Sequence, residues 1–406
     1  MNVRYNKQYN MPRVLPDGEL QRRHDRLQKV MKAENLAAAL VFSSDGVFKT
    51  WLLGQYVQGY ACVGDILTVD GPGYIVGEEF LVFRYLEDGE SIDDCSTPTD
   101  IDSLKRSVSF SYAPIGAAVA RTGSRRIGLY HPEEMSIDAW EYMKKHLPDA
   151  EYVDVTEKFD AVRMEKSTAE IELSVKSLAS LERVFAAIPA LLEPGITEFE
   201  CANRIRNLQN EGLTGDLNSH MRKKVWLVSN PDGEALSPEP LTYPGRYLRY
   251  GDRVDVTVHS PALEWVHAAM ARSFVMADEV SDETRRKWDI AVKATRLAAE
   301  MLRPGETLGN IASRVSGFLA GNGCREDGSV FLYAVYYGMM EQPCLADKSR
   351  DMPLRENSII AVFPRAIFGG EAPMCCGDMY LVTPEGGKRL GSLTQDILPV
   401  KGLWNF

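Results

Sequence analysis

The stretch Gly251–Ala277, GDRVDVTVHSPALEWVHAAMARSFVMA, concentrates more polar chemistry than any other part of the chain. Its alternation of apolar and polar residues predicts two strands joined by a short turn, because side chains in a strand point to opposite faces with period two. On this pattern Asp255, Thr257 and His259 share one face of the first strand. His267 begins the second strand, so we expect two histidines, an aspartate and a threonine to look into one space.

Histidine exchanges a proton near neutral pH, so His267 is the leading candidate for a catalytic proton shuttle. Its predicted face carries Ala269 and Ala271, which leave room for a substrate. His259 is the second catalytic candidate, and Asp255 is placed to orient it. Alternatives stay open: a core histidine bonded to the backbone, a turn histidine at a strand end, or one metal ion held by both histidines and the aspartate.

Aromatic and ionisable side chains elsewhere are candidates for substrate binding. Tyrosine can donate to a developing oxyanion or stack on a ring, and tryptophan can form the wall of a pocket. Glutamate can activate water, and arginine can hold a carboxylate with two hydrogen bonds. For each of them a core, loop or surface role is the alternative. The candidates are Thr257, Tyr333, Tyr337, Glu341, Trp226, Arg365, Cys376, Tyr56 and Tyr60, with Trp265 as a further wall residue.

Composition narrows the class of protein. With 406 residues, 45% of them hydrophobic and 25% charged, the chain is long enough for two or three globular domains. A net charge of −11 argues against nucleic acid or an anionic membrane as the main partner and is typical of an intracellular enzyme. The seven cysteines are scattered and fit neither a disulfide framework nor a zinc motif. No signal peptide and no run of about 20 apolar residues is visible, so a cytoplasmic location is expected.

The first part of the chain predicts an α/β domain over residues 1–160. A helical pattern over 19–34 is followed by an apolar strand at 36–43. A second strand at 126–131 is followed by a helix at 136–145. Strands that alternate with helices are typical of an α/β layer.

An internal repeat organises the second predicted domain, residues 161–406. Leu192–Thr197 reads LEPGIT and is echoed by LRPGET at Leu302–Thr307. In each copy a long helical pattern precedes the turn, and Thr197 or Thr307 is a suitable N-cap for a second helix. Strands follow in both copies, so two facing units are expected to enclose a cavity between helices and a curved sheet.

The order of these segments resembles the creatinase/aminopeptidase P/prolidase family, which has the pita-bread fold. The matching segments are RLQKVMKAENLAAALVFS, EYVDVTEKFDAVRMEKSTAEIELSVKSLAS, LRPGETLGNIASRV, GDRVDVTVHS, ARSFV and GDMYLVTPEGGKRLGSLTQDILPV. The resemblance implies an α/β (α+β) protein with an N-terminal creatinase-type domain and a duplicated pita-bread domain whose curved sheet is antiparallel. It also implies a homodimer in which the N-terminal domain, with Tyr56 and Tyr60, lies near the site of the other subunit.

The same resemblance implies where metal ligands would stand, because peptidase members hold two metal ions with two aspartates, a histidine and two glutamates. The corresponding positions here are Thr257, Ala269, Gly328 or Ser329, Phe363 and Gly377. None of these residues offers the carboxylate or imidazole donors that such ions require. We therefore expect no dinuclear metal site, no cofactor and no metalloaminopeptidase activity.

Without metal ligands, the chain is most similar to the metal-free branch of the family, creatinase and ectoine-hydrolase-like members. This branch implies hydrolysis of a C–N bond in a small non-peptide molecule. His267 stands five residues before Arg272, as a histidine does in ectoine-hydrolase-like members, and would shuttle the proton. His259 or Glu341 would activate water. The positions of the creatinase histidine and glutamates hold Leu236, Ala271 and Cys376, which argues against creatine as the substrate.

Two other functions stay open. Phe363, Tyr333, Tyr337 and Trp265 make the expected site aromatic, which suits a cofactor-independent lyase that cleaves a C–C or C–heteroatom bond in an aromatic or uncharged molecule. A non-catalytic protein that binds a ligand is the third function class.

Overall fold

The computed structural model describes residues 16–41, 73–76, 79–81, 123–135, 137–210, 224–231, 245–261, 266–325, 330–336 and 340–400. The chain divides into two compact units, Met1–Arg163 and Met164–Phe406. Within the described residues no helix is long and apolar enough to span a membrane.

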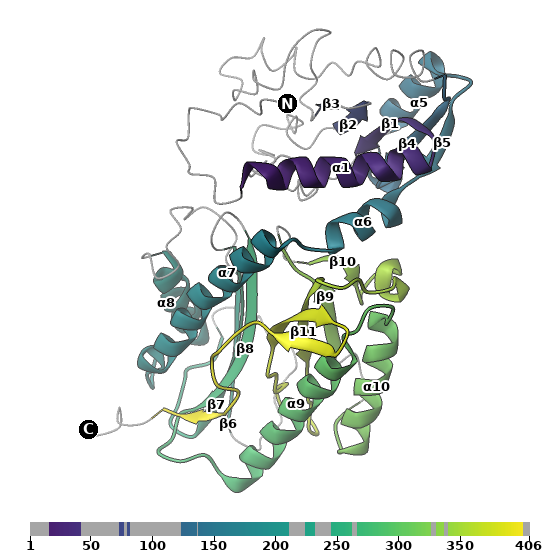
Figure 1. The fold of residues 1–406 in the computed structure, drawn as a ribbon. Coiled ribbons are helices and arrows are strands. Elements are labelled where there is room, and N and C mark those ends of the chain that lie inside the picture. The colour runs from purple at the N-terminus through teal and green to yellow at the C-terminus, as the bar shows by residue number, and fades with distance from the viewer. Residues whose placement is uncertain are drawn as a thin grey trace, which may run out of the picture. The chain divides into compact units, whose positions relative to one another are not determined.

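The first unit contains a five-stranded sheet with the strand order β3-β2-β1-β4-β5 (Figure 1). The strands are β1 (Leu36–Val41), β2 (Gly73–Val76), β3 (Glu79–Leu81), β4 (Arg126–Tyr130) and β5 (Glu151–Asp154). The helices are α1 (Asp17–Ala33), η2 (Pro132–Glu134), α5 (Ile137–His146) and α6 (Thr156–Met164), which ends at the first residue of the second unit. Parallel pairing of β1 with β4 and of β4 with β5 confirms the predicted α/β layer.

The second unit contains the two helix pairs that the repeat predicts. The helices are α7 (Thr168–Ala187), η3 (Ile188–Leu191), α8 (Glu198–Asn210), α9 (Asp282–Met301), α10 (Leu308–Gly321) and η5 (Lys348–Asp351). The Thr197 hydroxyl accepts a hydrogen bond from the backbone N–H of Glu200 at 3.1 Å. The Thr307 hydroxyl accepts one from Asn310 at 3.2 Å, so both predicted N-caps are confirmed.

Glycine makes the turn before each second helix. Gly195 and Gly305 have φ angles of 89° and 88°, a left-handed conformation that glycine adopts without a steric penalty. The repeat in the sequence is therefore a repeat of backbone geometry.

Two sheets lie between the helices. One has the order β14-β8-β7-β6 and the other β10-β9-β11-β12-β13. Their strands are β6 (Lys224–Pro231), β7 (Asp252–Pro261), β8 (His267–Val275), β9 (Val330–Ala334), β10 (Glu341–Cys344), β11 (Ile359–Pro364), β12 (Asp378–Thr383), β13 (Gly386–Arg389) and β14 (Leu398–Pro399). All neighbours pair antiparallel except β14, which runs parallel to β8. The single antiparallel sheet of the prediction is thus two sheets with one parallel edge.

The two sheets are joined at Ala271 and Gly377. Each residue donates its backbone N–H to the carbonyl of the other at 3.1 Å. The guanidinium of Arg272 also donates to both carbonyls, at 2.7 and 2.9 Å. This junction fixes the position of β8 against β12.

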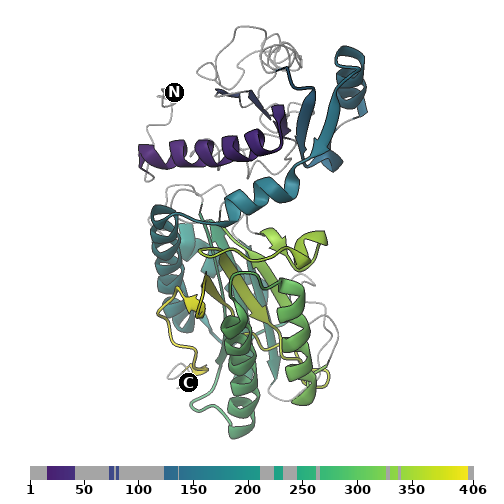
Figure 2. The ribbon, with the colours of Figure 1, turned by 45° about the vertical axis from the view of Figure 1, so that its right-hand side comes forward.

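Helices cover the outer faces of both sheets. Helix α7 packs along β8 and α8 along β6, whereas α9 and α10 lie side by side against β11 and β9 (Figures 1 and 2). The core accordingly has two hydrophobic clusters. One contains Val256, Ala269, Tyr333 and Phe363. The other packs residues of α9 and α10 against the opposite face of β9 and β11.

Candidate functional site

Strands β7 and β8 place the polar residues predicted for the site on one face. Residues directly opposite each other in an antiparallel pair point to the same side. Thr257 lies opposite Ala271, and His259 lies opposite Ala269. His267 lies opposite Pro261 on the same face. The register agrees with the alternation in the sequence, while the catalytic roles of these residues stay predictions.

His259 lies within a group of aromatic rings. The Tyr333 hydroxyl is 2.9 Å from its Nε2 atom and 3.1 Å from its Nδ1 atom. The ring centroids of Phe363 and Trp226 lie 5.4 and 4.9 Å from that of His259. We name Trp226, His259, Tyr333 and Phe363 the aromatic cluster. It brings β6 and β7 of one sheet into contact with β9 and β11 of the other.

Burial sets the charge of the two polar members of this cluster. Desolvation lowers the pKa of His259 to about 3, and the neighbouring His267 and Lys224 lower it further in the same direction. Desolvation also raises the pKa of Tyr333 well above its ordinary value. At neutral pH the imidazole is therefore uncharged and the phenol keeps its proton. The Tyr333 hydroxyl can donate to the unprotonated ring nitrogen, and the pair offers hydrogen bonds rather than a strong base.

Asp255 belongs to an ion pair and does not orient His259. Its carboxylate accepts a hydrogen bond from Arg253 Nε at 3.0 Å and another from the Ser273 hydroxyl. Burial raises the pKa of Asp255, while Arg253 opposes this shift. The prediction that Asp255 orients His259 is wrong, because Tyr333 lies at the ring nitrogens instead.

Glu341 and Arg365 also have structural partners. The Glu341 carboxylate lies 3.7 Å from the ammonium of Lys166, and both side chains are buried. The Arg365 guanidinium lies over the ring of Phe331, 5.6 Å from its centroid. The structure thus places Glu341 in a buried ion pair and Arg365 in a cation–π contact. Their predicted contacts with a substrate stay untested.

Cys376 lies on the wrong side of the sheet for the site. It is fully buried in the cluster that packs against α9 and α10. Its neighbour Cys375 shares a hydrophobic cluster with Tyr333 and Phe363 instead. Burial raises the pKa of both thiols, that of Cys376 to about 12, so neither is a thiolate at neutral pH. This burial gives no support to a contact of Cys376 with the substrate, which stays a prediction.

The residues at the family's metal positions do not fit a two-metal centre. A Cβ atom at Gly377 would lie 2.3 Å from two atoms of the Phe363 ring, so this ring fills the space of a longer side chain there. Thr257 and Ala269 bring no charged donor. Across the part of the chain that the structure describes, no three His, Cys, Asp or Glu residues lie close enough to hold a metal ion.

The remaining predicted residues divide into two groups. Thr257, His267 and the cluster member Trp226 are half-buried. Phe331, which the sequence analysis missed, pairs with Phe363 on the same face and is 39% exposed. Its alternation with Tyr333 was the available signal. Tyr56, Tyr60, Tyr337, Trp265, Leu236, Gly328 and Ser329 lie outside the described residues.

Comparison with family models identifies both halves of the chain. Residues 175–384 match the model of metallopeptidase family M24. Residues 23–165 match the creatinase/prolidase N-terminal domain. These matches confirm the predicted fold class and the resemblance at the level of the family.

Two curated relatives match part of the chain at low sequence identity. The chain is 25% identical over 249 residues to "Probable dipeptidase PepE" of Mycobacterium tuberculosis, covering 60% of this chain and 63% of the relative. It is 26% identical over 203 residues to "Creatinase" of a Bacillus species, covering 48% and 46%. The chain thus matches less than two thirds of the length of either relative.

Solved structures show the fold over almost the whole chain. An X-Pro aminopeptidase from Thermotoga maritima has a TM-score of 0.66 at 18% identity, covering 93% of this chain and 99% of that one. Dipeptidase PepE from Mycobacterium ulcerans has a TM-score of 0.69 at 19% identity, covering 95% and 99%.

These relatives correct the functional prediction. Those named as dipeptidase, prolidase or X-Pro aminopeptidase are peptidases, and the matching family model is one of metallopeptidases. The predictions of a metal-independent hydrolase for non-peptide molecules, of a lyase and of a protein outside the metalloaminopeptidases are therefore wrong. The metal-free branch is likewise unsupported. The physical reason for the error is that ligand residues report on metal binding and do not identify the molecule that a pocket accepts.

Proposed function

Because the chain belongs to metallopeptidase family M24, we propose that it acts on short peptides bound at the sheet face that carries the aromatic cluster. The matched segment, residues 175–384, contains all four members of this cluster. A curated relative named as a probable dipeptidase supports the choice of a short peptide.

The observation that carries the proposal is the pairing of His259 with Tyr333 between apolar rings. A peptide bond presents a carbonyl acceptor and an N–H donor, flanked by side chains. When the Tyr333 hydroxyl accepts from the N–H of the uncharged His259 ring, its own proton can be donated to the carbonyl, and the other ring nitrogen of His259 can accept from the N–H group. Trp226 and Phe331 offer apolar surface for a neighbouring side chain.

Burial strengthens these interactions. Hydrogen bonds count for more where the rings of the cluster exclude water, because the effective dielectric constant is lower there. His259 acts in this scheme as a positioning group for the amide, since its pKa of about 3 makes it a weak base. The residues at the metal positions bring no charged ligand, so the roles assigned here are binding and orientation of the peptide.

A peptide panel tests the proposal. Purified protein is incubated with dipeptides that vary in both residues, in metal-depleted buffer and, separately, with added Mn²⁺. Released amino acids are measured by mass spectrometry, and binding by calorimetry. We expect binding and cleavage of at least one peptide class. Neither binding nor cleavage of any peptide in either buffer overturns the proposal.

Tyrosine variants locate the activity. Tyr333→Phe removes the hydroxyl at His259, and we expect binding to weaken about tenfold, the usual scale of one lost hydrogen bond. Tyr152→Phe is the matched control, because its hydroxyl donates to the carbonyl of Leu147 in the other unit. Equal affinities of both variants and the wild type would place the peptide elsewhere.

We further propose that the chain forms a homodimer, as the family resemblance implies. Light scattering coupled to size-exclusion chromatography measures the mass in solution. A mass near 90 kDa, about twice that of the 45.3 kDa chain, is expected. A monomer at micromolar concentration contradicts the proposal.

A further inference from the structure

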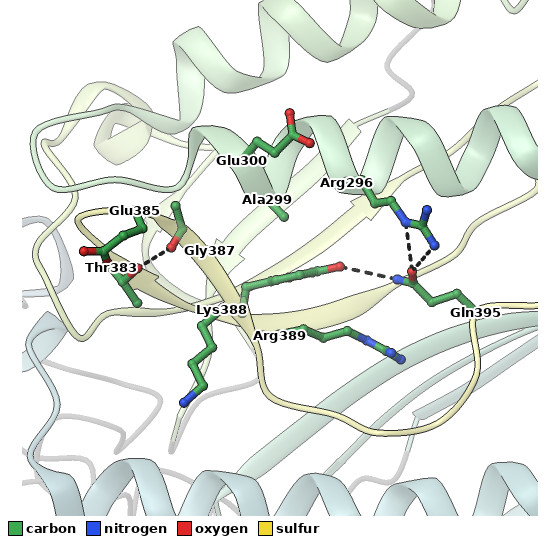
Figure 3. Close-up of a pocket in the computed structure, with 11 residues that line it drawn as sticks. Arg296, Ala299, Glu300, Thr383, Glu385, Gly387, Lys388, Arg389 and Gln395 are labelled. Atoms are coloured by element: carbon green, nitrogen blue, oxygen red, sulfur yellow. Dashed lines mark hydrogen bonds between the residues drawn. The ribbon is translucent and has the colours of Figure 1, made fainter.

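An open groove lies between α9 and the β12–β13 hairpin (Figure 3). It lies on the face of the β10-β9-β11-β12-β13 sheet that is opposite to the aromatic cluster. Its volume is about 450 Å³. The charged and polar residues that line one end are Arg296, Arg389 and Gln395. The Gln395 amide also donates to the hydroxyl of Tyr380, another lining residue, at 3.4 Å. Lys388 also lines the groove.

A single buried carboxylate underlies this end of the groove. Asp378 accepts hydrogen bonds from Arg272 Nη2 at 2.9 Å and from Arg389 at 3.1 and 3.2 Å. It also accepts one from the Gln395 amide at 2.8 Å. Two guanidinium groups therefore share one negative charge.

A third guanidinium lies beside them without a carboxylate. Arg296 donates from Nε and Nη2 to the amide oxygen of Gln395, both at 3.3 Å, and the described residues give it no other acceptor. In Figure 3 the Glu300 carboxylate points away from Gln395, and Glu385 lies at the opposite end of the groove. Three arginines and one aspartate leave two positive charges unbalanced at this end.

Such a surplus favours an anion. Guanidinium groups form their strongest hydrogen bonds with carboxylate or phosphate oxygens, which a neutral amide oxygen at 3.3 Å replaces poorly. We propose that this end of the groove, between Arg296 and Arg389, binds a small doubly charged oxyanion that displaces the Gln395 oxygen from Arg296. The anion is a phosphate group or a dicarboxylate, since both present oxygens that fit the Nε–Nη2 fork of Arg296 and the Nη1 donor of Arg389, whose Nε and Nη2 are bound to Asp378.

Calorimetry on the full chain tests this site. Inorganic phosphate is titrated at neutral pH and constant ionic strength against a chloride reference, and succinate is titrated in a second arm. We expect saturable binding with a Kd of about 1 mM or tighter for at least one of them. Saturation by phosphate alone assigns a phosphate group, and saturation by succinate alone assigns a dicarboxylate. No heat beyond the chloride reference in either arm overturns the proposal.

Two arginines of the same helix provide the matched variants. Arg296→Gln removes the unbalanced charge, and we expect at least tenfold weaker binding of the anion. Arg286→Gln changes an exposed arginine of α9 that does not line the groove and should bind as the wild type does. Thermal unfolding with and without phosphate checks that both variants fold, since a bound anion raises the melting temperature. Equal affinity of Arg296→Gln and wild type contradicts the assignment.

Discussion

The burial of His259 makes the stability of the protein depend on pH. In the folded chain its pKa is about 3, against 6.5 for an ordinary histidine. Between these values the unfolded chain binds a proton that the buried imidazole does not, so acidification favours unfolding. The free energy of unfolding therefore rises with pH across this window and gains nothing more from His259 above it. The slope is about 1.4 kcal/mol per pH unit, or roughly 3 kcal/mol over two units.

Urea unfolding of wild type and His259→Asn, followed by circular dichroism from about pH 6.5 to about pH 4.5, isolates this contribution. The raised pKa of Asp255 acts in the opposite direction, because its folded carboxyl takes up a proton first. It is present in both proteins and cancels in the difference between the two slopes. We expect the wild type to lose roughly 2 kcal/mol more than the variant over this range, because the unfolded histidine is only half protonated at its upper end.

A second variant separates the loss of the His259 titration from a general loss of packing. Tyr333→Phe keeps His259 among the same rings, and phenol ionisation plays no part at acidic pH because the pKa of Tyr333 is raised. It should therefore retain the wild-type slope, whatever its absolute stability. Parallel curves for wild type and His259→Asn would refute the conclusion that His259 is buried in its neutral form.

Three further substitutions test the packing around the sheets. Gly377→Ala should destabilise the fold by about 1–3 kcal/mol in thermal unfolding, because the new Cβ meets the Phe363 ring. Adding Phe363→Leu should recover part of that loss, and simple additivity of the two changes would contradict the contact. Asp378→Asn leaves the buried charge of Arg272 uncompensated and should cost about 3–5 kcal/mol in urea unfolding, so a loss below about 1 kcal/mol would argue against the ion pair. Gly305→Ala should cost about 1 kcal/mol for backbone reasons alone, because its φ is 88° and no described residue other than its chain neighbours lies within 4 Å of the new Cβ. An unchanged melting temperature would show that the turn adopts another conformation.

Features that depend on local rules could be predicted from the sequence. The PGxT repeat predicted two helix starts, and capping by Thr197 and Thr307 needs only the residue three positions later. Alternation placed Thr257 and His259 on one face, because a strand has a fixed period of two. In both cases the interacting or co-facing residues lie within three positions of each other in the chain.

Features of the site that depend on packing could not be predicted in this way. Tyr333 lies 74 positions from His259 in the chain, and only the approach of the two sheets brings them together. Cys375, and not the predicted Cys376, shares a hydrophobic cluster with Tyr333 and Phe363. Both cysteines precede β12, where the backbone is not a regular strand and alternation does not predict which side chain faces the cluster. The Arg253–Asp255 pair was visible, since residues two apart share a strand face, and was overlooked in favour of a histidine partner.

The contact between Phe363 and Gly377 also restricts the order in which this sequence can change. A carboxylate side chain at position 377 needs the space that the aromatic ring now occupies. A glutamate there is therefore accommodated only after position 363 has become smaller, whereas shrinking position 363 first leaves only a cavity. Substitutions at the two positions are therefore coupled. Any series of substitutions that leads from this chain to one with a glutamate at 377 must first replace Phe363 by a smaller residue.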